Sequence, residues 1–357
     1  MGCEIISNIL KSAVLTYGES EKYFPNIGDY IQSLAALQYI EGNFITIDRE
    51  RMDVYDGDEV KLICNGWFMS DSVHWPPSKK INPLFVAFHI TPDAKENILS
   101  EQGIEYLKKH EPIGCRDKDT MYLLQEYGIC AYFSGCLTLT LNKSYISCQD
   151  RDGIYFVDPQ VIRPKSVFEI IAVLLHAFKN ISAISKLLPK VEQNYFVKHG
   201  GFVWRFIYTS VFYKQYSSFF SDELLINAEF ISHEKELPDT RDIQASFEYA
   251  NSLLQKYANA SLVITSRIHC ALPCTSLNTP CLFVDRDGLS QKRFEGLIDL
   301  LNVLKLDGMK ILPKDDCINH ISNMVDGKIT TTSKVTPKTS HVRISHKLSE
   351  IVSDFFR

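Results

Sequence analysis

Short apolar runs alternate with amphipathic stretches along the first 150 residues. The runs, bounded by polar or turn-forming residues, lie at residues 13–17, 44–47, 61–65 and 84–88. Apolar side chains at helical spacing lie at residues 31–38, 98–108 and 118–127. Runs of this kind are typical of buried strands, and the amphipathic stretches are typical of helices. The alternation predicts parallel strands joined by crossover helices.

The second half of the chain resumes the same alternation after a polar stretch near residue 150. Strands are predicted at residues 154–157, 228–231, 261–265 and 281–284, and helices at residues 167–178 and 242–257. We therefore expect an α/β fold with two Rossmann-like domains facing a cleft. The predicted domains are residues 1–150 and 151–330, and residues 331–357 form a polar connection and a last helix.

Composition narrows the class of protein. Of the 357 residues, 45% are hydrophobic and 23% are charged, as in soluble globular proteins. With a net charge of −5, the chain lacks the excess of basic residues that is typical of nucleic-acid-binding proteins, so we expect no nucleic-acid partner. The ten cysteines include no C-x-x-C pair, which favours a reducing, cytoplasmic setting. We expect neither a signal peptide nor a membrane span of about 20 apolar residues.

The run at residues 261–265 ends in Ser266, Arg267 and, two residues later, His269. In an open α/β sheet, ligands bind at the carboxyl ends of the strands, and the start of the next helix favours an anion. An arginine and a histidine at that place predict an acidic ligand and a proton transfer. The alternative is a histidine whose hydrogen bonds are satisfied within the core.

Two asparagine-glycine motifs occupy comparable places in the first half. The segment from Asn26 to Asp29 is either a turn with Asp29 as helix N-cap, or a place where Gly28 lets the backbone approach a ligand. Asn65 and its following glycine end another apolar strand in the same way.

Three further cations are candidates for binding an anion. Arg116 follows a strand predicted at residues 111–114. It is either half of a surface ion pair or a bidentate hydrogen-bond donor to a carboxylate or phosphate. Lys292 and Arg293 open an apparent helix and form either a solvated helix end or ligand contacts. No metal site is expected, because His269 and the cysteines after it lack a zinc-ligand spacing.

Residues 200–220 are rich in aromatic side chains with only two charged ones among them. Aromatic residues are usually buried, so a core helix or interdomain packing is the first interpretation. The second is a surface that meets a lipid-linked or sugar acceptor at a membrane interface.

Five motifs, in order along residues 13–305, resemble the polysaccharide pyruvyl transferase family. They are NIGDYIQS at residues 26–33, NGW at 65–67, CRD at 115–117, SGCLT at 134–138 and TSRIH at 265–269. The resemblance implies a GT-B-like architecture with the active site between its halves. It implies phosphoenolpyruvate as donor and a sugar acceptor, two of whose hydroxyls become bridged by a pyruvate ketal.

The resemblance also suggests roles for the candidate residues. His269 would act as general acid or bind the leaving phosphate, and Asp29 would orient or deprotonate the acceptor. The positive charge of the donor site would come from Arg267, Arg116, Lys292 and Arg293. The remaining substrate-binding candidates are Asn26, Gly28, Asn65 and Ser266. This scheme requires no cofactor, because phosphoenolpyruvate is itself a substrate.

The acceptor implied by the resemblance is a cell-surface polysaccharide or its lipid-linked precursor, with galactose as a candidate sugar. Peripheral contact with the inner face of the plasma membrane would follow, and the oligomeric state stays open. Two alternatives remain: a glycosyltransferase that uses a nucleotide sugar, and a non-catalytic sugar-binding or assembly protein that keeps the fold.

Overall fold

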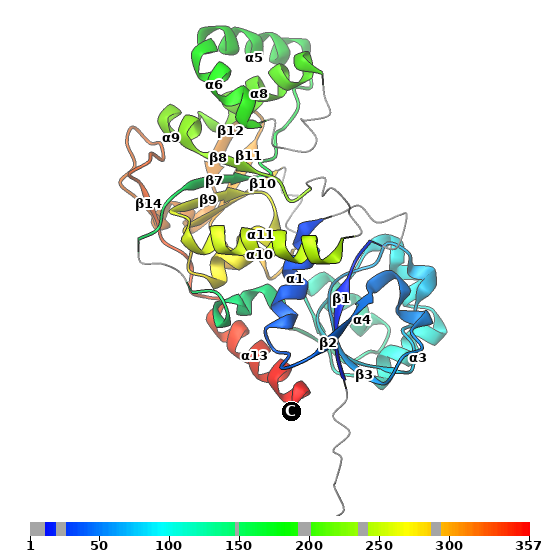
Figure 1. Ribbon diagram of the computed structural model, residues 1–357. Helices are drawn as coiled ribbons and strands as arrows, with labels where there is room; N and C mark the ends of the chain where they lie inside the picture. Colours follow the sequence, from blue (N-terminus) through cyan, green and yellow to red (C-terminus); the bar gives the residue numbers. More distant parts are fainter. Residues whose placement is uncertain (1–10, 19–25, 147–149, 192–200, 235–241, 287–293) are drawn as a thin grey trace, which may run out of the picture. The chain divides into compact units, whose positions relative to one another are not determined.

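The computed structural model describes residues 11–18, 26–146, 150–191, 201–234, 242–286 and 294–357 (Figure 1). The described chain forms two compact units. The first is built mainly from Gln32–Leu137, together with strand β1 and the C-terminal residues from His346 onward. The second is built from Thr138–Ser345 and from residues 26–31.

A six-stranded sheet forms the centre of the first unit. Its strands, in spatial order, are β2 (Phe44–Asp48), β1 (Lys11–Thr16), β3 (Val60–Phe68), β4 (Ile81–Ile90), β5 (Ile113–Cys115) and β6 (Ala131–Phe133). All neighbouring strands are parallel. The α-helices with residues in this unit are α1 (Ile27–Leu37), α2 (Lys95–Ile98), α3 (Glu101–Lys109), α4 (Lys118–Glu126) and α13 (Val342–Phe356). Parallel pairing confirms the prediction from the alternating pattern.

Aromatic packing fills the core on one part of this sheet. Phe68 and Phe88, from β3 and β4, have ring centroids 4.8 Å apart, and both rings lie against Trp75. Tyr106 of α3 reaches the same cluster through Trp75. These buried rings hold the long strands β3 and β4 in place, and with them the loops that follow their carboxyl ends.

The second unit has its own six-stranded sheet. Its strands, in spatial order, are β12 (Lys310–Pro313), β11 (Val303–Asp307), β10 (Cys281–Arg286), β9 (Leu262–Thr265), β7 (Ile154–Val157) and β8 (Glu229–Ile231). All pairs are parallel except β11 with β12, which form a hairpin. The α-helices are α5 (Val167–Lys179), α6 (Ile181–Val191), α8 (Phe202–Tyr216), α9 (Asp222–Asn227), α10 (Ile243–Asn259) and α11 (Ile268–Ser276). A small pair, β13 (Ile321–Ser322) and β14 (Lys334–Val335), lies outside this sheet.

Phe156 of β7 lies at the centre of the second core. Rings of Phe212, Tyr216, Phe220 and Phe230 surround it, with centroids between 5.3 and 5.8 Å from its own. The aromatic residues near the end of α8 are therefore core residues, as the first interpretation of residues 200–220 predicts. The start of α8 is exposed, however, so the interpretation holds for only part of the segment.

The structure corrects one local prediction. Helix α1 begins at Ile27, so Asp29 lies inside its first turn and is not the N-cap. Asn26 precedes the helix instead, and its Oδ1 accepts a hydrogen bond from the backbone N–H of Gly28 at 3.0 Å. Asparagine is as effective an N-cap residue as aspartate, and Asn26 lies three residues before Asp29 in the chain. Asp29 is nevertheless buried.

Within the described part of the chain, no single helix is long and apolar enough to cross a membrane. Helices α5 and α6 together have the necessary length and composition, but the chain bends by 103° between them.

Candidate functional site

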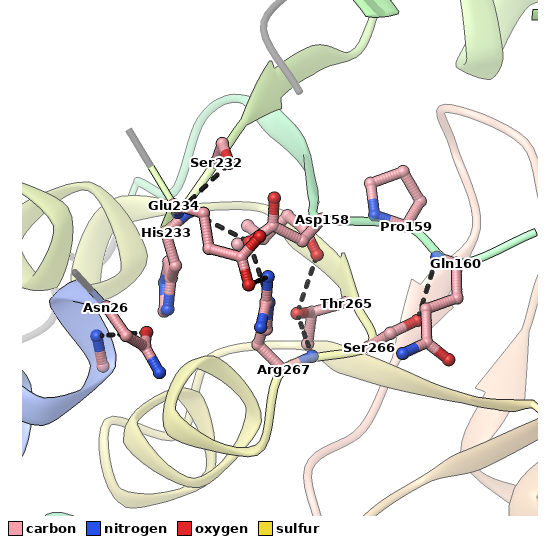
Figure 2. Close-up of polar contacts among 12 residues, drawn as sticks. Asn26, Asp158, Pro159, Gln160, Ser232, His233, Glu234, Thr265, Ser266 and Arg267 are labelled. Atoms are coloured by element: carbon pink, nitrogen blue, oxygen red, sulfur yellow. Dashed lines mark hydrogen bonds and ion pairs between the residues drawn. The ribbon is translucent and has the colours of Figure 1, made fainter. Parts of the chain in front are cut away.

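Three neighbouring strands of the second unit end at the same sheet edge. Because β8, β7 and β9 are parallel, their carboxyl ends bring the residues that follow them together. Asp158 follows β7, His233 and Glu234 follow β8 after one serine, and Arg267 follows β9 after another (Figure 2). This edge is where ligands bind in open α/β sheets.

An ion-pair network joins the three strand ends. Nε of Arg267 donates to Oδ2 of Asp158 at 2.9 Å, and Nη2 of Arg267 pairs with Oε1 of Glu234. Burial raises the pKa of Glu234, and this effect outweighs the lowering by Arg267. Glu234 is thus a carboxyl group that takes up a proton more readily than an exposed one. With both carboxylates ionised, the three side chains together carry a net charge of −1, so the positive charge of Arg267 is more than compensated.

Backbone contacts hold this network in register. Oδ2 of Asp158 also accepts the backbone N–H of His233 at 2.9 Å, which ties the end of β7 to the end of β8. The hydroxyl of Thr265 donates to the Val157 carbonyl and accepts the Arg267 N–H, both at 3.0 Å. Asp158 has a φ of +43°, a conformation that non-glycine residues rarely adopt, so these contacts hold it where its carboxylate meets Arg267.

His233 is buried beneath the network. Its Nε2 lies 2.7 Å from the hydroxyl of Tyr257, on helix α10. Burial lowers the pKa of His233 to about 4, so the ring is neutral at pH 7. A neutral imidazole fixed in this way supports the loop that carries Glu234.

His269 lies in the first turn of α11 against the segment that opens helix α1. The backbone N–H of Ile27 donates to the His233 carbonyl at 3.1 Å, which fixes that segment beside β8. A Cβ atom built on Gly28 would lie 3.1 Å from Nδ1 of His269 and 3.0 Å from Oδ1 of Asn26. Glycine therefore lets the backbone approach the imidazole closely without displacing the side chain of His269 or Asn26.

Ser266 has a structural contact in the same unit, because its hydroxyl accepts the backbone N–H of Gln160 at 3.2 Å. Asn65, in the first unit, likewise contacts backbone: its Nδ2 donates to the Gln32 carbonyl at 3.1 Å. Gly66 after it has a φ of +98°, and a Cβ there would lie 2.8 Å from the Gln32 side chain. This motif holds helix α1 against β3.

Arg116 follows β5 in the first unit and is 1% exposed. Its Nε lies 3.5 Å from Oδ2 of Asp117, and that carboxylate is 2.7 Å from Nδ1 of His89. Burial by itself would raise the pKa of Asp117, but His89 and Arg116 together lower it to about 2. Nη2 of Arg116 has no hydrogen-bond partner within the described residues, so the guanidinium has capacity for an anion.

The structure thus divides the predicted site residues between the two units. Those in the second unit are Asn26, Gly28, Asp29, Ser266, Arg267 and His269. Those in the first are Asn65 and Arg116, and the predicted pair Lys292 and Arg293 lies outside the described residues. Within the described ranges, no group of three or more His, Cys, Asp or Glu residues could hold a metal ion.

Sequence reasoning missed the partners of Arg267. Asp158, His233 and Glu234 were not among the candidates, although each follows a run that was predicted as a strand. The sequence feature that could have indicated them is the presence of polar side chains directly after the predicted strands at residues 154–157 and 228–231. The pairing itself joins residues more than 30 positions apart, so no local pattern shows it.

A family model described as polysaccharide pyruvyl transferase matches residues 26–288. No curated protein and no solved structure matches the chain. The matched range contains the whole network at the strand ends, together with His269 and Arg116.

Proposed function

This chain belongs to the polysaccharide pyruvyl transferase family, and we propose that it transfers pyruvate from phosphoenolpyruvate to a sugar of a cell-surface polysaccharide or its lipid-linked precursor. Two hydroxyls of the sugar form bonds to C2 of the donor, and the bond from C2 to the phosphate oxygen breaks. One hydroxyl proton ends on C3, which becomes a methyl group, and the other leaves with phosphate. Galactose is our candidate acceptor.

The observation that supports this proposal most is the sheet edge of the second unit, where proton-holding and charged groups meet. The enol carbon of the donor must gain a proton before C2 becomes electrophilic, so the reaction needs a general acid. We assign that role, or binding of the leaving phosphate, to His269. Its place in the first turn of α11 suits binding of the leaving phosphate, because the N–H groups at the start of a helix favour an anion.

The cations differ in what they offer to a donor with a carboxylate and a phosphate. Arg116 has a buried guanidinium with free hydrogen-bonding capacity, which supports a contact with one of these groups. Arg267 is a further proposed donor contact, and its guanidinium is held in place at the strand ends by Asp158 and Glu234. Lys292 and Arg293 remain proposed donor contacts.

The acceptor would be oriented or deprotonated by Asp29, which is buried one residue after Gly28. Asn26, Asn65 and Ser266 contribute, in this proposal, by holding the backbone around the substrates. A GT-B-like architecture and a place at the inner face of the membrane also belong to the proposal.

Incubation of the purified chain with phosphoenolpyruvate and a galactoside tests this function. Released phosphate and the mass of the acceptor are measured together, with a nucleotide sugar as the alternative donor in a parallel reaction. We expect phosphate release in step with a gain of pyruvate on the acceptor. Release of nucleotide in the parallel reaction would instead identify a glycosyltransferase, and phosphate release without acceptor modification would contradict transfer.

A further inference from the structure

Helix α5 of the second unit exposes a broad apolar face. The α5 face consists of Val167, Phe168, Ile170, Ile171, Leu174, Leu175 and Phe178 of this helix, with Ile181 just after it. Phe168 and Phe178 are each 83% exposed. Only the opposite side of the helix, with Val173 and Ala177, is buried. In Figure 1, α5 lies on the outer side of α6 and α8, away from the sheet of this unit.

The start of α8 extends this face. Arg163, just before α5, lies over the ring of Trp204 at 4.9 Å, which places the beginnings of the two helices side by side. Phe202 and Val203 are exposed there. Soluble monomers rarely expose contiguous apolar patches larger than a few hundred Å², and larger ones mark an interaction surface.

The apolar face lies in a segment rich in basic residues. Residues 161–191 contain five Lys or Arg residues against a single acidic residue, in a chain whose net charge is −5. Of these, Arg163, Lys165, Lys179 and Lys186 are exposed. A wide apolar arc with a basic border is the pattern of helices that lie in the interface of an anionic membrane.

A basic cavity lies beside the same helix. It has a volume of about 440 Å³, and its positive charge comes from Lys214 of α8, Lys310 and Lys328. His176 of α5 also lines it, with a pKa that burial lowers. Asp222 is the acidic residue in its lining. The size and charge of the cavity suit a phosphate-bearing head group.

We propose that the α5 face docks onto the surface of an anionic phospholipid membrane. The apolar side chains enter the boundary between head groups and acyl chains, and the surrounding lysines contact the phosphates. Only the further step, that docking brings the enzyme to a lipid-linked acceptor, rests on the proposed function. A second copy of the chain is the less favourable occupant, because two faces with the same excess of positive charge repel each other.

Flotation of the purified full-length chain with vesicles tests this proposal. One set of vesicles contains phosphatidylcholine alone, and the other contains phosphatidylcholine with phosphatidylglycerol. We expect flotation with the anionic set that weakens as salt rises. The double variant Phe168→Asp with Phe178→Asp should bind at least about tenfold less, because charges replace the apolar contacts. The control Ile146→Asp changes a residue that is 87% exposed but lies outside the α5 face, and it should bind like the parent.

Two outcomes would overturn the proposal: no flotation of the parent with anionic vesicles, or equal flotation of the parent and the double variant. Light scattering tests whether a second copy of the chain covers the face instead. If the parent is a dimer that does not bind vesicles, and the double variant is a monomer, the face mediates self-association. Circular dichroism checks that the variants are folded. Turnover on a soluble galactoside is measured without vesicles, so a failed docking experiment stays distinct from a failed transferase assay.

Discussion

Nε of Arg267 donates a hydrogen bond to Oδ2 of Asp158 at 2.9 Å, which joins the ends of strands β9 and β7. The same carboxylate oxygen accepts the N–H of His233, so one side chain aligns three neighbouring strand ends. The guanidinium also pairs with Glu234. The geometry of the proposed donor site therefore depends on Asp158 as much as on the arginine.

Replacing Asp158 by Asn should weaken both the fold and turnover. The variant leaves Arg267 with one carboxylate, and we expect the free energy of unfolding to fall by about 2 kcal/mol, less than for a fully buried pair because Arg267 is partly exposed. Urea denaturation measures the change. Asp58→Asn is the matched control, since its ion pair with Lys11 is exposed and should contribute little. Equal stability of parent and Asp158→Asn would refute this account of the network.

The close approach of Gly28 to His269 can be tested by adding one methyl group. In Gly28→Ala the new Cβ is 3.1 Å from Nδ1 of His269, so the imidazole must shift by a few tenths of an ångström. Small misplacements of a catalytic group can lower turnover about tenfold to a hundredfold, and we expect a loss of that order. The control Gly201→Ala meets nothing within 4 Å. Unchanged kcat in Gly28→Ala would argue against a catalytic role for His269.

The buried guanidinium of Arg116 should matter more for the donor than for the sugar. Arg116→Lys keeps the charge but removes the planar fork that suits a carboxylate or phosphate. We expect KM for phosphoenolpyruvate to rise about tenfold, with little change in KM for the acceptor. Steady-state kinetics with each substrate varied in turn measures the two constants. If only the KM for the acceptor rises, Arg116 contacts the acceptor and not phosphoenolpyruvate, which would contradict this prediction.

Burial of His233 makes stability depend on pH in a defined window. Its pKa falls from 6.5 to about 4 on folding, so the unfolded chain binds the proton more readily between these values. Stability from this group is complete above pH 6.5 and is lost as the pH falls toward 4, by about 3 kcal/mol in all. The difference in unfolding free energy between the parent and His233→Asn should shrink over that range. A difference independent of pH would show that His233 is not held neutral.

The sequence predicted the repeating features well, because they depend on local patterns. Apolar runs such as residues 154–157 became strands, and Arg267 and His269 lie at a strand end as expected. The predicted cap at Asp29 was wrong, because two residues in one segment could cap and only the structure shows that Asn26 does.

Features that depend on distant contacts could not be predicted in this way. The network of Arg267 joins residues that follow three separate strands, and the local sequence of Asp158 or Glu234 shows a polar residue after a strand but not its partner. The apolar residues at 167–178 predicted a helix correctly, but such a pattern is equally typical of a core helix. Which side of α5 the protein covers is decided by the packing of α6 and α8.

Pyruvyl transfer is tested most directly by running the reaction in D₂O and analysing the acceptor by mass spectrometry and NMR. If a general acid protonates the donor at C3, the ketal methyl group should carry one deuterium, and His269→Gln should lower its rate of formation. An unmodified acceptor, or a product that keeps the methylene group of phosphoenolpyruvate, would contradict the proposed transfer.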